Sequence, residues 1–179
     1  MYKIIKTVLI LFLLIGRFSL AEAKINLFET PRYLPAISFY GDSGKSYRLQ
    51  DFKADLLMAV VWSKNCGPCL NDLKHLNSFA QKTMGSGIQV ILISPEKEWR
   101  TPDERRLFLQ RIGAPNLVSY LDRKAHFADG MGIQATPTTI LVNSSGEEVG
   151  QITGSVKWDS SDVIDYMLKL KDKTLKQLN

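Results

Sequence analysis

The residues most able to do chemistry are two cysteines, Cys66 and Cys69, separated by Gly67 and Pro68. Two thiols at this spacing can be a redox dithiol, half of a metal site or a permanent crosslink. Because the chain has only two cysteines in 179 residues, a disulfide-rich scaffold and a zinc site of four thiolates are both excluded. A permanent crosslink across so short a loop would stabilise the fold little. The spacing alone leaves these interpretations open, and the position of the pair must separate them.

The position of the pair along the chain supports the redox interpretation. Cys66 follows the apolar run Leu56–Trp62, which has the length of a buried strand, and precedes a helical pattern. Pro68 is tolerated in the first turn of a helix. Unpaired N–H groups and the helix dipole should hold the pKa of Cys66 below the usual value of about 8.5, whereas Cys69, one turn on, should be buried and protonated. Cys66 is therefore the expected nucleophile and Cys69 the resolving thiol.

Metal and cofactor binding are not expected. His75 and His126 are the two histidines of the chain. His75 should point away from Cys69 on the same helix, and His126 lies in a polar segment. Each is more typical of a surface histidine than of a ligand.

Pro137 is the second informative residue, because Thr136-Pro137 directly precedes an apolar segment of strand length. A cis bond there would offer a backbone edge facing the dithiol, to which an extended substrate could pair. An ordinary trans proline at the start of a strand is the alternative, and the spacing leaves both open.

The elements that must position these residues alternate along the chain. We expect a mixed β-sheet with helices on both faces, an α/β architecture in a single domain. The predicted strands are Leu56–Trp62, Ile88–Ile93 and Val118–Leu121, a hairpin of Thr138–Val142 with Glu148–Ile152, and an earlier hairpin of Ile37–Phe39 with Ser46–Leu49. The predicted helices follow Cys66, begin at Pro102, and begin after Ser160 or Ser161.

The first 23 residues are predicted to be a secretory signal peptide. Lys3 and Lys6 precede the apolar run Val8–Ile15, and Ala21 and Ala23 suit a cleavage site. An uncleaved anchor is the alternative, but the run is shorter than the roughly 20 residues that span a bilayer. We therefore divide the chain into a leader (1–23), an N-terminal segment (24–33) and a domain (34–179), and expect a periplasmic protein.

The charge gives no indication of nucleic-acid binding. The net charge is +5, and removal of the leader leaves 20 basic and 17 acidic residues without a Lys/Arg cluster. Hydrophobic residues make up 45% and charged residues 23%, as in an ordinary globular domain. We expect a monomer.

The sequence from Trp62 to Cys69, followed some seventy residues later by Ala135–Thr138, resembles the thioredoxin superfamily. Further segments resemble the exported TlpA/ResA-like thiol:disulfide oxidoreductases, and the likeness extends from about Leu34 to Leu170. These segments are Leu34-Pro35, Gly44-Lys45, Leu49–Phe52, Tyr120–Asp122, Met131–Ile133 and Pro137–Val142 with Gly146.

The resemblance implies a thioredoxin-like fold with a TlpA-type insertion at residues 94–121, Cys66 as nucleophile and Cys69 as resolving cysteine. It also implies that the proline is cis and contacts substrate, and that the tryptophan packs beside the site. The implied partners are protein disulfides and a membrane-embedded dithiol electron carrier, often in cytochrome c maturation. The substrate-binding residues would be Trp62, Gly67, Pro68, Thr136 and Pro137.

Two positions depart from the family. Thioredoxins carry a buried acid six residues before the first cysteine, where this chain has Val60, so no carboxylate is evident for Cys69. Asn65 replaces the usual bulky residue before the nucleophile. The Gly-Pro dipeptide is that of thioredoxins, reductants at about −270 mV, and favours reduction; a disulfide oxidase or isomerase is the alternative.

Two other classes of protein remain as alternatives. A thiol peroxidase would require a proline seven residues and a Thr or Ser three residues before the cysteine; Ser63 fits, but Ala59 does not. A copper metallochaperone could bind Cu(I) through both thiolates and His126.

Overall fold

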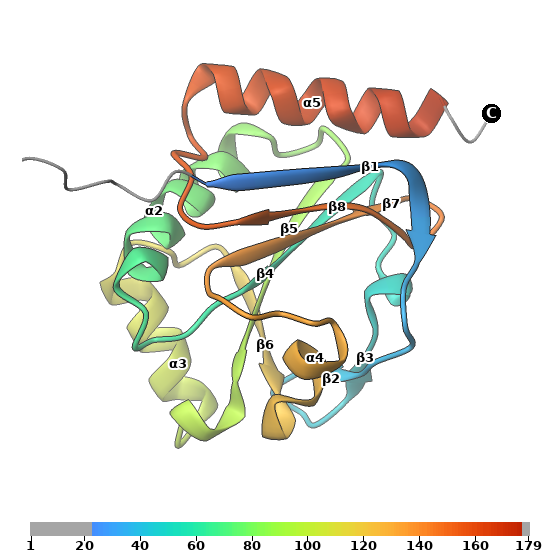
Figure 1. Ribbon diagram of the computed structural model, residues 1–179. Helices are drawn as coiled ribbons and strands as arrows, with labels where there is room; N and C mark the ends of the chain where they lie inside the picture. Colours follow the sequence, from blue (N-terminus) through green and yellow to red (C-terminus); the bar gives the residue numbers. More distant parts are fainter. Residues whose placement is uncertain (1–22, 177–179) are drawn as a thin grey trace, which may run out of the picture.

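The apolar segment before the cysteine pair forms β4 (Leu56–Val61), near the centre of an eight-stranded sheet (Figure 1). In the computed structural model, which describes residues 23–176, the strand order is β1-β8-β7-β4-β5-β6-β2-β3. All six residues of β4 are buried, as expected for a strand covered on both faces. β4 pairs in parallel with β5 (Ile88–Pro95) and antiparallel with β7 (Thr138–Asn143). The sheet is therefore mixed, as predicted.

The remaining strands extend the sheet on both sides of β4. β6 (Val118–Asp122) lies parallel to β5, and β8 (Glu147–Thr153) forms the predicted hairpin with β7. The short strands β2 (Phe39–Tyr40) and β3 (Ser46–Tyr47) form the predicted N-terminal hairpin at one edge. Short 3-10 turns cover Leu49–Asp51, Glu96–Glu98 and Arg123–Ala125.

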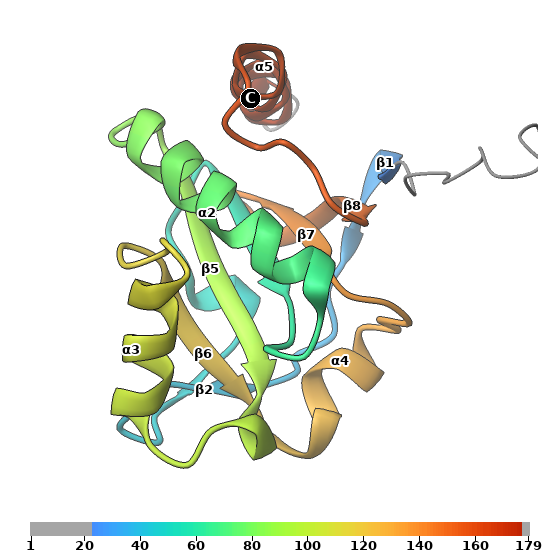
Figure 2. The same ribbon diagram turned by 90° about the vertical axis from the view of Figure 1, so that its left-hand side faces the viewer.

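Helices cover both faces of the sheet (Figure 2). α2 (Gly67–Lys82), α3 (Pro102–Arg111) and α5 (Ser161–Lys176) contribute to one apolar cluster. α4 (His126–Gly130) contributes Phe127 to the cluster on the opposite face.

The alternating side chains of β4 connect these two clusters. Leu56 and Met58 face the cluster of α2, whereas Leu57 and Ala59 face that of α4. This alternation is the period of two expected of a β-strand. Because Trp62 continues it on the α2 side, the residue that precedes the active-site loop is directed into the core.

Two elements of the fold, β1 and α4, were not predicted from the sequence. Residues 24–33, expected to lie outside the domain, form β1 (Lys24–Tyr33), which pairs antiparallel with β8. Helix α4 was not predicted; the buried carboxylate of Asp122 starts it by accepting hydrogen bonds from the N–H groups of Phe127 (2.8 Å) and Ala128 (3.0 Å). The predicted leader, apart from its last residue, lies outside the described residues. Within residues 23–176, no helix combines the length and apolar character needed to cross a membrane.

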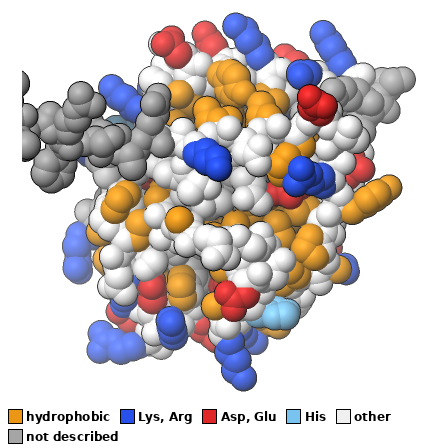
Figure 3. Space-filling model, in the orientation of Figure 1, with side chains coloured by type: hydrophobic (Ala, Val, Ile, Leu, Met, Phe, Trp, Pro, Cys, Tyr) orange, Lys and Arg blue, Asp and Glu red, His pale blue; other side chains and the backbone are white. Residues whose placement is uncertain are grey.

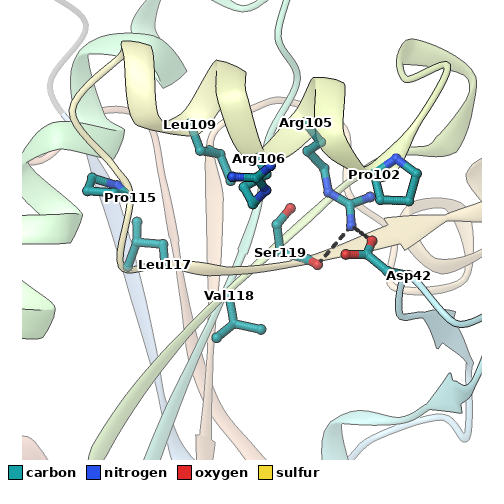
Figure 4. Close-up of a pocket in the computed structure, with 9 residues that line it drawn as sticks. All are labelled: Asp42, Pro102, Arg105, Arg106, Leu109, Pro115, Leu117, Val118 and Ser119. Atoms are coloured by element: carbon teal, nitrogen blue, oxygen red, sulfur yellow. Dashed lines mark hydrogen bonds and ion pairs between the residues drawn. The ribbon is translucent and has the colours of Figure 1, made fainter.

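The pocket between α3 and β6 is closed at one end by a buried arginine (Figure 4). The guanidinium of Arg105, with 3% of the residue exposed, donates to the carboxylate of Asp42 and to the carbonyl of Ser119 (3.2 Å). Burial lowers the pKa of Arg105, and the carboxylate of Asp42 opposes that effect. β2 pairs with β6 through Tyr40 and Leu121 only, and Arg105 adds a hydrogen bond to the carbonyl of Ser119 on β6. The contact joins the inserted helix to the sheet.

Candidate active site

The cysteine pair lies where β4 ends and α2 begins. Cys66 is the N-cap of α2 and is half-buried, whereas Cys69 is completely buried. The two sulfurs form a disulfide, with their Cα atoms 5.2 Å apart. One sulfur is therefore accessible and the other lies behind it, as the sequence predicts.

The environment of the Cys66 sulfur favours a negative charge. The backbone N–H of Cys69 donates to Cys66 Sγ at 3.2 Å. Pro68 occupies the first turn of α2, and no acidic residue lies in that turn. In the reduced protein, this N–H group and the helix dipole would stabilise a thiolate on Cys66.

The loop before β7 faces this sulfur. The Thr136–Pro137 peptide bond is cis, which confirms the isomer that the resemblance implied. Cys66 Sγ lies 3.4 Å from the carbonyl oxygen of Thr136. Thr138 fixes the loop by donating its hydroxyl to the carbonyl of Ala135 at 2.8 Å. The fold thus brings together Cys66 and Thr136, which are 70 positions apart in the sequence.

The five expected substrate-binding residues differ in exposure. Gly67, Pro68 and Thr136 are exposed beside Cys66, but Pro137 is buried. Trp62 has no exposed surface: it packs against Trp99 and Phe108 of the insertion, with ring centroids 5.8 and 6.3 Å away. Because its side chain follows the inward alternation of β4, Trp62 packs beneath the site, as the resemblance implied, and it borders the adjoining groove; its contact with substrate stays a prediction.

A buried carboxylate lies one helical turn beyond Cys69, where the sequence analysis found none. Asp72, with 2% of the residue exposed, accepts from the N–H of Val156 (3.1 Å) and the indole N–H of Trp158 (3.2 Å). Burial raises the pKa of Asp72, and these hydrogen bonds and His75 oppose that rise. The i, i+3 spacing of Cys69 and Asp72 on an amphipathic helix could have revealed it.

An apolar groove adjoins the dithiol. It measures about 210 Å³ and lies between the active-site loop, the end of β5 and the segment from α4 to Thr136. Its lining includes Ser63, Ala125, Ala128, Ile133, Ala135 and Thr136. The pocket in Figure 4 shares none of these residues and lies elsewhere in the molecule. The groove is the hollow best placed to receive a substrate chain.

The histidines are placed apart from the cysteines. Nδ1 of the half-buried His75 lies 2.9 Å from a carboxylate oxygen of Asp159, and His126 is exposed on α4. Among residues 23–176, no three His, Cys, Asp or Glu side chains are grouped closely enough to hold a metal ion. On the face in Figure 3, Lys and Arg side chains are interspersed with Asp and Glu.

Comparison with known proteins identifies the family. Residues 31–168 match the Redoxin family. This chain belongs to the Redoxin family. Within it, the chain is similar to the thiol-disulfide oxidoreductase ResA of Halalkalibacterium halodurans, with 26% identity over 113 residues, or 63% of this chain and 62% of that protein. It is also similar to the thiol:disulfide interchange protein DsbE of Vibrio cholerae, with 28% identity over 105 residues, or 59% and 53%. The matched region is thus less than two thirds of either relative.

Solved structures of other thiol:disulfide interchange proteins share the fold of this Redoxin-family chain. A thiol:disulfide interchange protein from Bacteroides sp. gives a TM-score of 0.62 at 20% identity, covering 81% of this chain and 91% of that one. A thioredoxin-family thiol:disulfide interchange protein of Chlorobium tepidum gives 0.60 at 17% identity, covering 79% and 99%. The thioredoxin-like fold and the ResA-like resemblance expected from the sequence are confirmed.

Proposed function

We propose that this protein is a thiol:disulfide oxidoreductase that exchanges the Cys66–Cys69 pair with disulfides of other proteins. One observation carries the proposal: an accessible sulfur at the start of a helix faces the Thr136 carbonyl and is bonded to a buried sulfur. The names of the ResA and DsbE relatives support the same activity.

In the reducing direction, the Cys66 thiolate attacks one sulfur of a substrate disulfide. A mixed disulfide forms, and the leaving substrate sulfur takes up a proton. Cys69 then loses its proton and attacks Cys66 Sγ, which releases the second substrate thiol. Two electrons and two protons pass to the substrate, and the protein is left with the Cys66–Cys69 disulfide.

The exposed residues beside Cys66 are the proposed docking surface. An extended substrate chain would lie along the Thr136 carbonyl and pass over Gly67 and Pro68. Trp62 and Pro137 would hold this surface in place from the interior. The adjoining groove would accept an apolar side chain of the substrate.

Reduction is the proposed direction, because the Gly-Pro dipeptide is that of thioredoxins. A reduction potential near that of thioredoxin, about −270 mV, would support a reductant. A value near about −120 mV, typical of a strong oxidant, would indicate the oxidase alternative instead.

The setting of the reaction is also a proposal. Export by the leader would place the dithiol in an oxidising compartment, so a reductant there requires a supply of electrons. A membrane-embedded dithiol carrier would provide them to a monomeric protein, and cytochrome c maturation is the expected pathway. Labelling of Cys66 in intact cells by a membrane-impermeant thiol reagent would test the location.

Trapping of mixed disulfides tests the activity. Cys69→Ser should accumulate a covalent complex with substrate proteins, because the resolving thiol is absent. Cys66→Ser should trap none, because Cys69 is buried. Equal trapping by both variants would contradict the assigned roles.

A further inference from the structure

Two hydrogen bonds of the loop that presents Cys66 are internal to the loop. The N–H of Asn65 donates to Ser63 Oγ at 3.1 Å, and the N–H of Cys66 donates to the carbonyl of Ser63 at 3.1 Å. These bonds shape the loop but do not attach it to the rest of the protein.

Glu98, which follows β5 in the inserted segment, supplies the attachment. One carboxylate oxygen accepts from the Ser63 hydroxyl at 2.5 Å, and the other accepts from the N–H of Lys64 at 2.9 Å. The same Ser63 oxygen accepts from Asn65, so the three residues before the nucleophile form one hydrogen-bonded chain that ends on Glu98. This use of the Ser63 hydroxyl also disfavours the thiol-peroxidase alternative, which would need it at the cysteine.

The insertion is itself held firmly where Glu98 emerges. The indole N–H of Trp99 donates at 2.9 Å to the hydroxyl of Ser94, which has no exposed surface. The ring of Trp99 packs on Trp62 and lies 4.9 Å beneath the ammonium of Lys64. Glu98 therefore joins the loop to a fixed part of the core.

We infer that Glu98 is a positioning residue for the nucleophile: its carboxylate holds residues 63–65 so that Cys66 Sγ stays aligned with the N–H groups of α2 and with the Thr136 carbonyl. The inference rests on the proposed function and adds to it a task for the inserted segment. Hydrogen bonds to a charged acceptor are stronger than those between neutral groups, which suits a single side chain holding a loop.

The test compares two variants of Glu98 by the pH dependence of Cys66 alkylation in the reduced protein, with the modified cysteine located by mass spectrometry. Glu98→Ala removes the attachment, and Glu98→Gln keeps an acceptor for the Lys64 N–H and a polar partner for Ser63. We expect Glu98→Ala to raise the pKa of Cys66 and to slow alkylation at neutral pH about tenfold, since small misplacements of reacting groups have effects of this size. Glu98→Gln should stay within about threefold of wild type.

The pair of variants separates position from charge. Loss of the negative charge alone would lower the pKa of Cys66 and speed alkylation in both variants. The inference would therefore be overturned if the pKa of Cys66 fell equally in both variants. It would also be overturned if Glu98→Ala left the pKa and the alkylation rate of Cys66 unchanged.

Glu104→Gln is the matched control, because Glu104 contacts the Lys64 ammonium (3.5 Å) but not the loop backbone. Should Glu98→Ala fail to fold, Ser63→Ala removes one of the two bonds to Glu98 together with the acceptor of the Asn65 N–H, and it should slow alkylation in the same direction. A wild-type Cys66 as slow as free glutathione would overturn the proposed function as well; a reactive Cys66 unaffected by Glu98→Ala overturns this inference alone.

Discussion

The carboxylate of Asp72 accepts a hydrogen bond from the indole N–H of Trp158, 86 residues further along the chain, at 3.2 Å. The bond ties α2 to the segment between β8 and α5 just below the active site. Ser155, in the same segment, donates its hydroxyl to the carbonyl of Pro68 at 3.3 Å. Asp72 lies one turn beyond Cys69, on the same face of α2 and equally buried. It is therefore the titratable group best placed to take the proton of the resolving thiol.

Asp72→Asn should slow resolution of the mixed disulfide. An amide cannot accept the Cys69 proton, and loss of a general base costs at least about tenfold. Attack by Cys66 should be unchanged, because it depends on the N-terminus of the helix. Rapid mixing with a fluorogenic disulfide substrate would separate the two steps. Asp159→Asn, in the same segment but paired with His75, is the control; equal slowing in both variants would point to a structural effect.

The same carboxylate should make stability depend on pH. Burial raises the pKa of Asp72 above its ordinary value of 3.8, so the folded protein holds this proton over a pH range in which the unfolded chain has lost it. We therefore compare the free energies of unfolding of wild type and Asp72→Asn. The value for wild type minus the value for Asp72→Asn should fall as pH rises from about 3.8 through the raised pKa of Asp72, and should be constant at higher pH. Urea unfolding of both proteins over a pH series would measure this. A difference that increases with pH would show that the hydrogen bonds outweigh burial.

Ala135→Trp should separate protein substrates from small ones. Ala135 is exposed and lines the groove beside Thr136, so a large side chain there fills the groove without disturbing the core. We expect exchange with a protein disulfide to fall about tenfold, while alkylation of Cys66 by a small reagent changes little. Met84→Trp, at a position that is 81% exposed and away from the groove, is the control. Equal loss in both assays would mean that the substitution distorts the dithiol itself.

Local sequence was enough to predict the central elements of the site. The apolar run that became β4 needs burial on both faces wherever it lies, and Pro68 is compatible with the first turn of a helix in almost any fold. Together they place Cys66 at a helix N-terminus. For the same reason the hairpin around Gly146, with its positive φ of 79°, was predictable.

What the sequence could not supply depends on distant partners. Thr136-Pro137 is compatible with both isomers, so its isomer depends on residues outside the dipeptide. Asp72 is an ordinary helix-surface aspartate until Trp158 and Val156 cover it. The segment Lys24–Tyr33 has little apolar alternation and forms a strand because β8 offers it an edge.

Gly150→Ala should detach β1 from the sheet. A Cβ at Gly150 would lie 2.6 Å from the carbonyl oxygen of Asn26 and 3.0 Å from the Cα of Leu27, so the two strands must separate. We expect a loss of about 1–3 kcal/mol in the free energy of unfolding. Hydrogen exchange should accelerate over residues 24–27.

The cysteine site should be unaffected by this substitution, because β1 is an edge strand separated from β4 by β8 and β7. Alkylation of Cys66 at neutral pH should therefore match wild type. Gln151→Ala, on the same strand next to Gly150, is the control and should leave exchange in β1 close to wild type. If exchange at residues 24–27 stays slow in Gly150→Ala, the pairing of β1 with β8 does not depend on this close approach, and the interpretation of Gly150 is wrong.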